Sequence, residues 1–277
     1  MIRTSTQLKA KIRNLSAGDS RKAQTLIRNY IMERFLERVA LSRYRNNFIL
    51  KGGMLVAAVV GLDTRATMDI DTTVKSLHLD MENARRIIEE IISVVIPDGV
   101  NFNITRATDI MQEHDYSGIR FMLEASMDNL RQAIKIDIST GDVITPHAME
   151  YSYHLMFEDR YISLLTYNLE TLLAEKMETI ISRATANTRM RDFYDIYVIS
   201  RQKSFDQDVL KDAFYATSEK RDTVVQIPDF IDIISSIESD EVMKSQWENF
   251  KNESFFVGEL SWTEVIESVK DLAAIII

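Results

Sequence analysis

Two short segments constrain the fold of this chain more than any other part of it. The segment Leu50-Lys51-Gly52-Gly53-Met54-Leu55 predicts a buried strand and a two-glycine turn that opens a helix. The segment Met68-Asp69-Ile70-Asp71-Thr72 predicts a second strand. Because strand side chains alternate between the two faces of a sheet, Asp69 and Asp71 share one face and Ile70 points into the core. We therefore expect a strand, a helix and a second strand that carries two carboxylates.

The same segments indicate a chemistry. Two carboxylates on one face repel each other unless a cation lies between them, so Asp69 and Asp71 form a candidate metal site. Gly52 and Gly53 would expose backbone N–H groups at a helix N-terminus, where phosphate groups bind. The alternatives are two solvent-facing acids on an edge strand and a tight turn without a ligand. A metal ion together with a phosphate indicates phosphoryl or nucleotidyl transfer.

A third carboxylate and an arginine extend the candidate site. In Ile134-Lys135-Ile136-Asp137-Ile138, alternation places Lys135 and Asp137 on one face and the isoleucines on the other. On a strand next to the first two carboxylates, Asp137 would complete a two-cation site. The alternative is a surface pair between Lys135 and Asp137. Arg65, four residues before Asp69, either contacts the phosphate or lies in a solvated loop.

A second group of charged residues lies on two predicted helices further along the chain. It consists of Lys176, Arg183, Arg189, Arg191, Asp192 and Asp195. Asp192 and Asp195 are three residues apart and share a helix face. A basic face on a second domain would clamp nucleotide phosphates across a cleft, with Asp192 orienting a basic residue or acting as a base. The alternative is a salt-bridge network within the helices.

The hydrophobic periodicity predicts an α+β fold with two domains. Residues 1–165 are expected to form a mixed sheet with helices, and residues 166–277 an all-helical domain. Strands are expected at residues 48–50, 67–74, 101–105, 117–123 and 133–139, the last three antiparallel. Helices are expected at residues 19–44, 54–60 and 80–95, after a cap at Asn168, and at residues 190–201, 206–218, 228–238 and 261–275.

The composition excludes several classes of protein. The 277 residues contain no cysteine, which excludes a disulfide framework and a cysteine-ligated zinc site. The four histidines, among them His114, lack the spacing of zinc ligands. No stretch approaches the roughly 20 apolar residues that span a bilayer, and no apolar signal segment follows Met1. We therefore expect a cytoplasmic protein without a membrane partner.

The charge distribution bears on nucleic-acid binding. The net charge of −9 disfavours non-specific binding, because contacts with phosphates supply most of that affinity. One N-terminal stretch is nevertheless basic and contains Arg21, Lys22, Arg28, Arg34, Arg38, Arg43 and Arg45. This stretch is either a nucleic-acid-facing surface or a solvated helix face.

With these residues identified, the chain resembles the AbiEii/AbiGii-type toxins of the DNA polymerase β-like nucleotidyltransferase superfamily, and it is similar to the MenT toxins. The matching motifs are spread over residues 50–200 and keep the order of the family. They are Lys51-Gly52-Gly53-Met54-Leu55, Arg65-Ala66-Thr67-Met68-Asp69-Ile70-Asp71, and Lys176…Arg183…Arg191-Asp192-Phe193-Tyr194-Asp195.

The resemblance implies a minimal nucleotidyltransferase domain followed by a helical domain. It implies that Asp69 and Asp71 are catalytic ligands of Mg²⁺, with two ions in the site. Asp137, which matches less closely, would be the third carboxylate of the superfamily. In the helical domain, the residues implied as essential are Lys176 and one of Asp192 and Asp195.

The resemblance also implies a nucleoside triphosphate as the substrate. Its phosphates would bind on Gly52 and Gly53, with contacts from Lys51, Arg65 and Arg183. In the superfamily the second position of this loop is more often serine. Because Gly53 stands there in this chain, no hydroxyl contact is expected from that position.

Members of this family are toxins of bacterial toxin–antitoxin and abortive phage infection systems, and a separately encoded antitoxin regulates them. Some similar toxins add nucleotides to the 3′ end of tRNA, which blocks aminoacylation and translation. The same acceptor is our hypothesis for this chain, with the N-terminal arginines facing the RNA. The alternatives are the same chemistry on a protein or small-molecule acceptor, and a non-catalytic module that binds nucleotide or the antitoxin.

Overall fold

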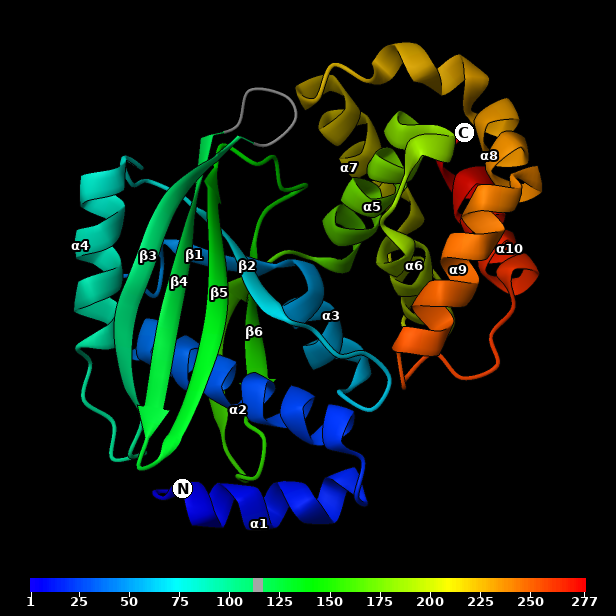
Figure 1. The fold of residues 1–277 in the computed structure, drawn as a ribbon. Coiled ribbons are helices and arrows are strands. Elements are labelled where there is room, and N and C mark those ends of the chain that lie inside the picture. The colour runs from blue at the N-terminus through cyan, green and yellow to red at the C-terminus, as the bar shows by residue number, and fades with distance from the viewer. Residues whose placement is uncertain (112–116) are drawn as a thin grey trace. The chain divides into compact units, whose positions relative to one another are not determined.

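The computed structural model describes residues 1–111 and 117–277, which form two compact units (Figure 1). The first unit comprises residues 1–58, 66–142 and 149–166, and the second comprises residues 59–65, 143–148 and 167–277. The predicted α+β class is confirmed, since a mixed sheet is followed along the chain by helices. His114 lies outside the described residues.

The first unit is built on a sheet whose described strands follow the order β3-β4-β5-β2-β1-β7-β6 (Figure 1). The strands are β1 Phe48–Lys51, β2 Asp69–Val74, β3 Asn101–Met111, β4 Ser117–Met127, β5 Leu130–Thr140, β6 Met149–His154 and β7 Tyr161–Thr166. β2 pairs with β5 in parallel, as β1 does with β7, and the other pairs are antiparallel. The predicted antiparallel set β3, β4 and β5 is therefore confirmed, and β5 lies beside the carboxylate strand β2.

The helices of the first unit are α1 Ser5–Ser16, α2 Ser20–Leu41, α3 Gly52–Val60, which continues into the second unit, and α4 Met81–Ile92. Side-chain caps begin helices α1, α2 and α4 of the first unit, and α3 begins at the glycine turn. The Asp19 side chain accepts from the N–H groups of Arg21 and Lys22, as expected for the cap of α2. α2 packs against β5, β7 and α4, and α4 packs against β3 (Figure 1).

The alternation of β5 separates an apolar face from a charged one. Ile134, Ile136 and Ile138 are at most 1% exposed, whereas Lys135 and Asp137 alternate with them. Because successive strand residues point to opposite faces, the isoleucines fill the core and the two charged side chains are left on the other face of the sheet. This division positions the candidate site.

The second unit is helical. Its helices are α5 Leu169–Arg183, α6 Met190–Gln202, α7 Gln207–Lys220, α8 Phe230–Ser239, α9 Glu241–Glu253 and α10 Trp262–Ile276, with short 3-10 turns at Ala184–Ala186 and Val224–Asp229. Asn168 caps α5 as predicted, because its side chain accepts from the N–H of Thr171. α6 packs against α5 and α10, and Phe193 of α6 contacts Trp262 in a tilted arrangement, with 5.3 Å between ring centroids. Among the described helices, none combines the length and the apolarity that crossing a bilayer requires.

Several elements were not predicted from the sequence. α1, α9, β6 and β7 were missed, and β7 occupies Tyr161–Thr166, just before the predicted cap at Asn168. β7 is a short apolar strand whose identity depends on its pairing with β1 and β6, which are distant in sequence. Segments 59–65 and 143–148 belong to the second unit although they precede residue 166.

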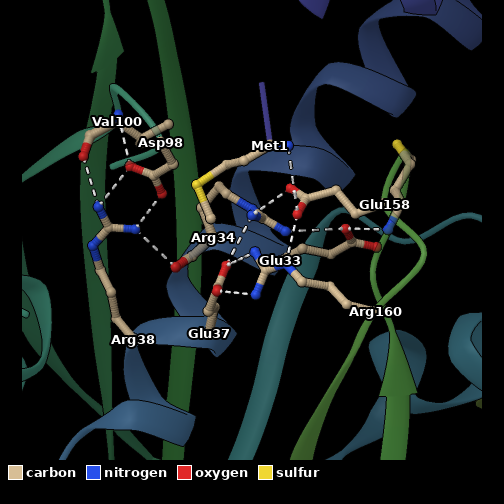
Figure 2. A network of polar contacts seen from close by, with 10 residues as sticks. Met1, Glu33, Arg34, Glu37, Arg38, Asp98, Val100, Glu158 and Arg160 are labelled. Carbon is tan, nitrogen blue, oxygen red and sulfur yellow. Dashed lines mark hydrogen bonds and ion pairs between the residues drawn. The ribbon is translucent and has the colours of Figure 1, made fainter. Parts of the chain in front are cut away.

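The prediction that the N-terminal arginines face RNA is wrong for Arg34 and Arg38. Residues 29–39 of α2 are buried without interruption, and these two arginines are 0% and 3% exposed. Arg38 donates to Asp98 at 2.8 and 3.1 Å and to the carbonyl of Val100 at 2.7 Å (Figure 2). Arg34 lies 2.8 Å from Glu37 and 3.2 Å from Glu158. Burial of a charge is tolerated only with such partners, so both arginines support the fold.

Glu33 is a carboxylic acid of this buried network with a strongly raised pKa (Figure 2). Its carboxyl accepts from the N–H of Met156 at 2.8 Å and from the hydroxyl of Tyr153 at 3.3 Å. Burial raises the pKa of Glu33 from 4.5 to about 8, although the Met156 N–H and the charge of Arg34 act in the opposite direction. Between these two values the native state retains a proton that the unfolded state has lost.

We therefore predict that Glu33→Gln becomes increasingly stabilising, relative to the wild type, as the pH rises. The contribution of protonated Glu33 to the unfolding free energy of the wild type is fully present below pH 4.5. It is lost as the pH rises toward the native pKa of about 8. The difference in unfolding free energy, variant minus wild type, should rise by up to about 1.4 kcal/mol per pH unit in this window. Urea unfolding at several pH values, followed by far-UV circular dichroism, measures it.

Glu124→Gln, which removes an exposed glutamate from β4, is the matched control. A Glu33→Gln difference that stays constant from pH 4.5 to 8 would contradict the interpretation that Glu33 is protonated in the native state.

Candidate active site

Charged residues form a row across four neighbouring strands of the sheet. Arg120 of β4 lies opposite Asp137 of β5, Asp137 lies beside Asp71 of β2, and Asp71 lies opposite Lys51 of β1. Residues paired directly across a ladder point to the same face. The row therefore places two carboxylates side by side between an arginine and a lysine. Asp69 lies two residues from Asp71 on the same face, beside Lys135.

Asp71 occupies space that Gly52 leaves open. A Cβ added at Gly52 would lie 2.3 Å from Oδ2 of Asp71, and the backbone of Gly52 has a φ of +64°. The sequence attributed the glycine pair to the approach of a phosphate. The structure adds a different reason for Gly52, since a side chain there would be strained and would collide with the carboxylate.

The electrostatic environment of Asp71 is unfavourable to its charge. Burial raises the pKa of Asp71 to about 6, and the negative charges of Asp69 and Asp137 act in the same direction. The positive charges of Lys51 and Lys135 offset only part of this effect. A bound cation would remove the repulsion between the carboxylates, so Asp71 and Asp69 fit a divalent ion that prefers oxygen ligands.

Asp137 fits a metal ion less well. Both of its carboxylate oxygens are bound by Arg120, at 2.8 and 2.7 Å, and Lys135 lies 3.7 Å from one of them. Within residues 1–111 and 117–277, no three His, Cys, Asp or Glu side chains are arranged to hold one metal ion. The predicted role of Asp137 as a metal ligand stays a prediction, and its observed partners are cationic side chains.

Lys51 is held at the end of β1 by a neighbour that the sequence did not single out. It forms an ion pair with Asp142, whose Oδ2 also accepts from the Ser139 hydroxyl at 2.9 Å. Both charged side chains are largely buried, at 12% and 7% exposure. Asp142 therefore fixes the ammonium group of Lys51 in the first unit.

In the second unit, Asp192 and Asp195 of the predicted group lie around Lys176. Its ammonium group lies 2.8 Å from Asp192 and 2.6 Å from Asp195, which are spaced one helical turn apart on α6. Asp195 also accepts from Arg65 at 2.6 and 3.1 Å. Arg189 lies 2.6 Å from Asp192. Two buried aspartates thus hold one lysine between them.

This arrangement decides the charge states of the cluster. Burial alone would raise the pKa of Asp192, but the charges of Lys176 and Arg189 lower it to about 2. Burial would likewise raise the pKa of Asp195, but Arg65 and Lys176 lower it. The two aspartates outweigh the desolvation of Lys176 and raise its pKa. Asp192 is ion-paired with both Lys176 and Arg189, a geometry that suits a residue that orients Lys176 better than a general base.

The two arginines predicted to contact the triphosphate, Arg65 and Arg183, differ in their surroundings. Arg65 is 3% exposed and bound to Asp195, so the interpretation as a solvated loop residue is wrong. Arg183 ends α5, seven residues after Lys176, and is half-buried.

Arg120, Lys135 and Asp142 are the site residues that sequence reasoning missed or used only as alternatives. Alternation within residues 117–123 would have placed Arg120 on the face opposite Ile119 and Phe121. Alternation predicts the face of the strand on which Arg120 lies, but it does not predict that Asp137 is its partner. That pairing depends on the register between β4 and β5, which is set by the tertiary structure.

Comparisons with known proteins identify a family that the chain matches. The model of a family described as "Nucleotidyl transferase AbiEii toxin, Type IV TA system" matches residues 34–272. No curated protein matches the chain. Among solved structures, the chain is similar to JHP933 from Helicobacter pylori, with 16% identity, 91% of each chain covered and a TM-score of 0.49. A second is an antigenic nucleotidyltransferase-like protein from Paracoccidioides brasiliensis, with 14% identity, 84% of this chain and 94% of that chain covered, and a TM-score of 0.39.

We predict that Gly52→Ala destabilises the protein more than Gly61→Ala. Both glycines have positive φ angles, +64° and +94°, but a Cβ at Gly61 meets nothing within 4 Å. Gly61→Ala should therefore cost only the backbone strain, about 1–2 kcal/mol. Gly52→Ala adds a collision with Asp71 and should cost more. Urea unfolding of the two variants measures the difference, and equal costs would contradict the close approach.

We also predict that Lys176→Met costs about 3–5 kcal/mol of stability, because it leaves two buried aspartates without their shared cation. The matched control is Lys244→Met, which breaks a solvent-exposed pair with Glu241 on α9 and should have a small effect. Thermal and urea unfolding compare the two variants. Similar losses from both would show that the buried cluster contributes no more than a surface ion pair.

Proposed function

The chain belongs to the AbiEii family of nucleotidyl transferase toxins of type IV toxin–antitoxin systems, and we propose that it transfers a nucleotide to the 3′ end of tRNA with the help of Mg²⁺. Membership of the family implies a nucleotidyltransferase, with a nucleoside triphosphate as its substrate and a cognate antitoxin as its regulator. The identity of the acceptor and the role of Mg²⁺ are our proposals.

One observation carries the catalytic part of the proposal. The carboxylate of Asp71 lies against Gly52 at the start of α3, and burial and Asp69 together raise its pKa to about 6. A carboxylate pair beside a helix N-terminus combines the ligands for a divalent cation with a place for phosphate oxygens. Nucleotidyl transfer needs both at once.

The residues of the first unit supply binding and orientation. Asp69 and Asp71 would hold Mg²⁺, which when bound neutralises negative charge on the reacting phosphate. The N–H groups at the start of α3 bind the triphosphate, and Lys51, held by Asp142, adds a positive charge beside Asp71.

The reaction forms one bond and breaks another. The 3′ hydroxyl of the acceptor attacks the α-phosphorus in line and loses its proton to solvent. The bond from that phosphorus to the oxygen that bridges it to the β-phosphorus breaks, and pyrophosphate leaves. Catalysis by the chain is then mainly positioning and charge compensation.

In the second unit, Lys176 is the residue suited to contact phosphate. Asp192 and Asp195 raise the pKa of its ammonium group and fix its position. A lysine that stays charged acts as a phosphate ligand and not as a base. Both aspartates are accordingly assigned a positioning role.

The proposal for tRNA rests on kinship with similar toxins. Within the basic N-terminal stretch, Arg34 and Arg38 are buried, and Arg43 and Arg45 are paired with Glu90 and Glu150. This stretch therefore offers less free positive charge to RNA than its sequence suggests. Transfer to a protein or a small molecule is the competing acceptor class.

The test is to incubate the full chain with Mg²⁺, each labelled nucleoside triphosphate in turn and total tRNA. We expect label at the tRNA 3′ end, and a loss of about 100-fold or more in Asp71→Asn. Asp109→Asn, which changes an exposed aspartate of β3, is the control and should retain activity. Equal labelling by Asp71→Asn and the wild type would overturn the assignment of the site, and label on added protein acceptors but not on tRNA would select the alternative.

A further inference from the structure

Two cationic side chains lie among the carboxylates of the sheet. Lys135 of β5 is in register with Asp69 of β2, and Arg120 of β4 is in register with Asp137 of β5. All four side chains are on the face that carries Asp71. The carboxylate motif predicted from the sequence consists of Asp69 and Asp71 and includes neither of these cationic residues.

Lys135 bridges two of the carboxylates. Its Nζ lies 2.6 Å from Oδ2 of Asp69 and 3.7 Å from Oδ2 of Asp137. The lysine is 28% exposed, and the two aspartates are 23% and 13% exposed. The ammonium group therefore lies as a positive charge between Asp69 and Asp137.

Arg120 completes the compensation of Asp137. Its guanidinium group makes two parallel hydrogen bonds to the carboxylate, at 2.8 and 2.7 Å, which is the bidentate geometry that arginine favours. Both carboxylate oxygens of Asp137 thereby accept a hydrogen bond from Arg120.

The cationic side chains of the site are distributed unevenly among its carboxylates. Asp69 is paired with Lys135, Asp137 with Arg120, and Asp142 with Lys51. Asp71 is the carboxylate whose charge is least compensated. A two-metal site needs acidic ligands shared between two ions about 3.5–4 Å apart, and here an ammonium group lies between two of those ligands.

We propose that Lys135, together with Arg120, takes the place of the second cation, so that this site binds one divalent ion, at Asp69 and Asp71, instead of two. The inference rests on the proposed function and changes its metal requirement from the two ions expected on sequence grounds. The lysine and arginine supply permanently the charge that a second ion would supply reversibly.

The experiment counts Mn²⁺, a paramagnetic substitute for Mg²⁺, in the full chain. The protein is mixed with Mn²⁺ and each ribonucleoside α,β-imidotriphosphate in turn, an analogue that cannot release pyrophosphate. Equilibrium dialysis gives the number of bound ions, and electron paramagnetic resonance detects spin coupling between neighbouring ions. We expect uncoupled Mn²⁺ in the wild type. A spin-coupled Mn²⁺ pair in the wild type would overturn the inference.

The variants test whether these side chains are responsible. In the double variant Lys135→Gln/Arg120→Gln, Asp69 and Asp137 lose their cationic partners, so we expect a second Mn²⁺ and a spin-coupled signal. A double variant with wild-type far-UV circular dichroism and no second ion would overturn the proposal. Arg131→Gln is the matched control, because Arg131 lies on the same face of β5 and bonds only to the carbonyls of Asp128 and Leu130 among the described residues.

The outcomes separate this inference from the proposed function. A coupled pair in the wild type leaves the nucleotidyltransferase site intact and rejects only the substitution by Lys135. If the wild type binds no Mn²⁺, and Asp71→Asn likewise binds none, the metal site of the proposed function is rejected. This inference is then rejected with it.

Discussion

The close approach of the Asp71 carboxylate to Gly52 is the constraint on which the candidate site depends. It requires β1 and β2 to be antiparallel neighbours in the register that sets Asp71 against Lys51. It also requires a residue without a Cβ at position 52, because the carboxylate oxygen lies 2.3 Å from where that atom would be. The glycine turn, the start of α3 and the carboxylate strand are therefore one structural unit, in which a change at one position displaces the others.

Paired burial of charge is the second theme of the molecule, and it occurs in both units. In the first unit, Arg34 and Arg38 are buried in α2 with carboxylate partners (Figure 2). In the second, Asp192 and Asp195 enclose Lys176. A buried ion pair contributes little net stability, but removal of one partner leaves a costly uncompensated charge. Such clusters thus fix side-chain positions more than they strengthen the fold.

The charged neighbours of each carboxylate also distinguish the candidate metal ligands from each other. The sequence predicted Asp69 and Asp71 as the metal ligands and Asp137 as a less closely matching third carboxylate. In the structure, Asp137 is bound by Arg120 through both oxygens, whereas burial and neighbouring negative charge act on Asp71. The chemical role of each carboxylate follows from its neighbours across the sheet.

The sequence by itself determined the local elements and the motif. The cap at Asn168, the strand–glycine–helix turn and the alternation of β5 are set by residues close together in the chain, and each was predicted. Only the tertiary structure decided the partners. The assignment of β7 as a strand, the burial of Arg34 and the pairing of Asp137 with Arg120 all depend on strand order and register, which join residues far apart in sequence. Periodicity gives each side chain a face, but the neighbour that it meets there is fixed only when the sheet assembles.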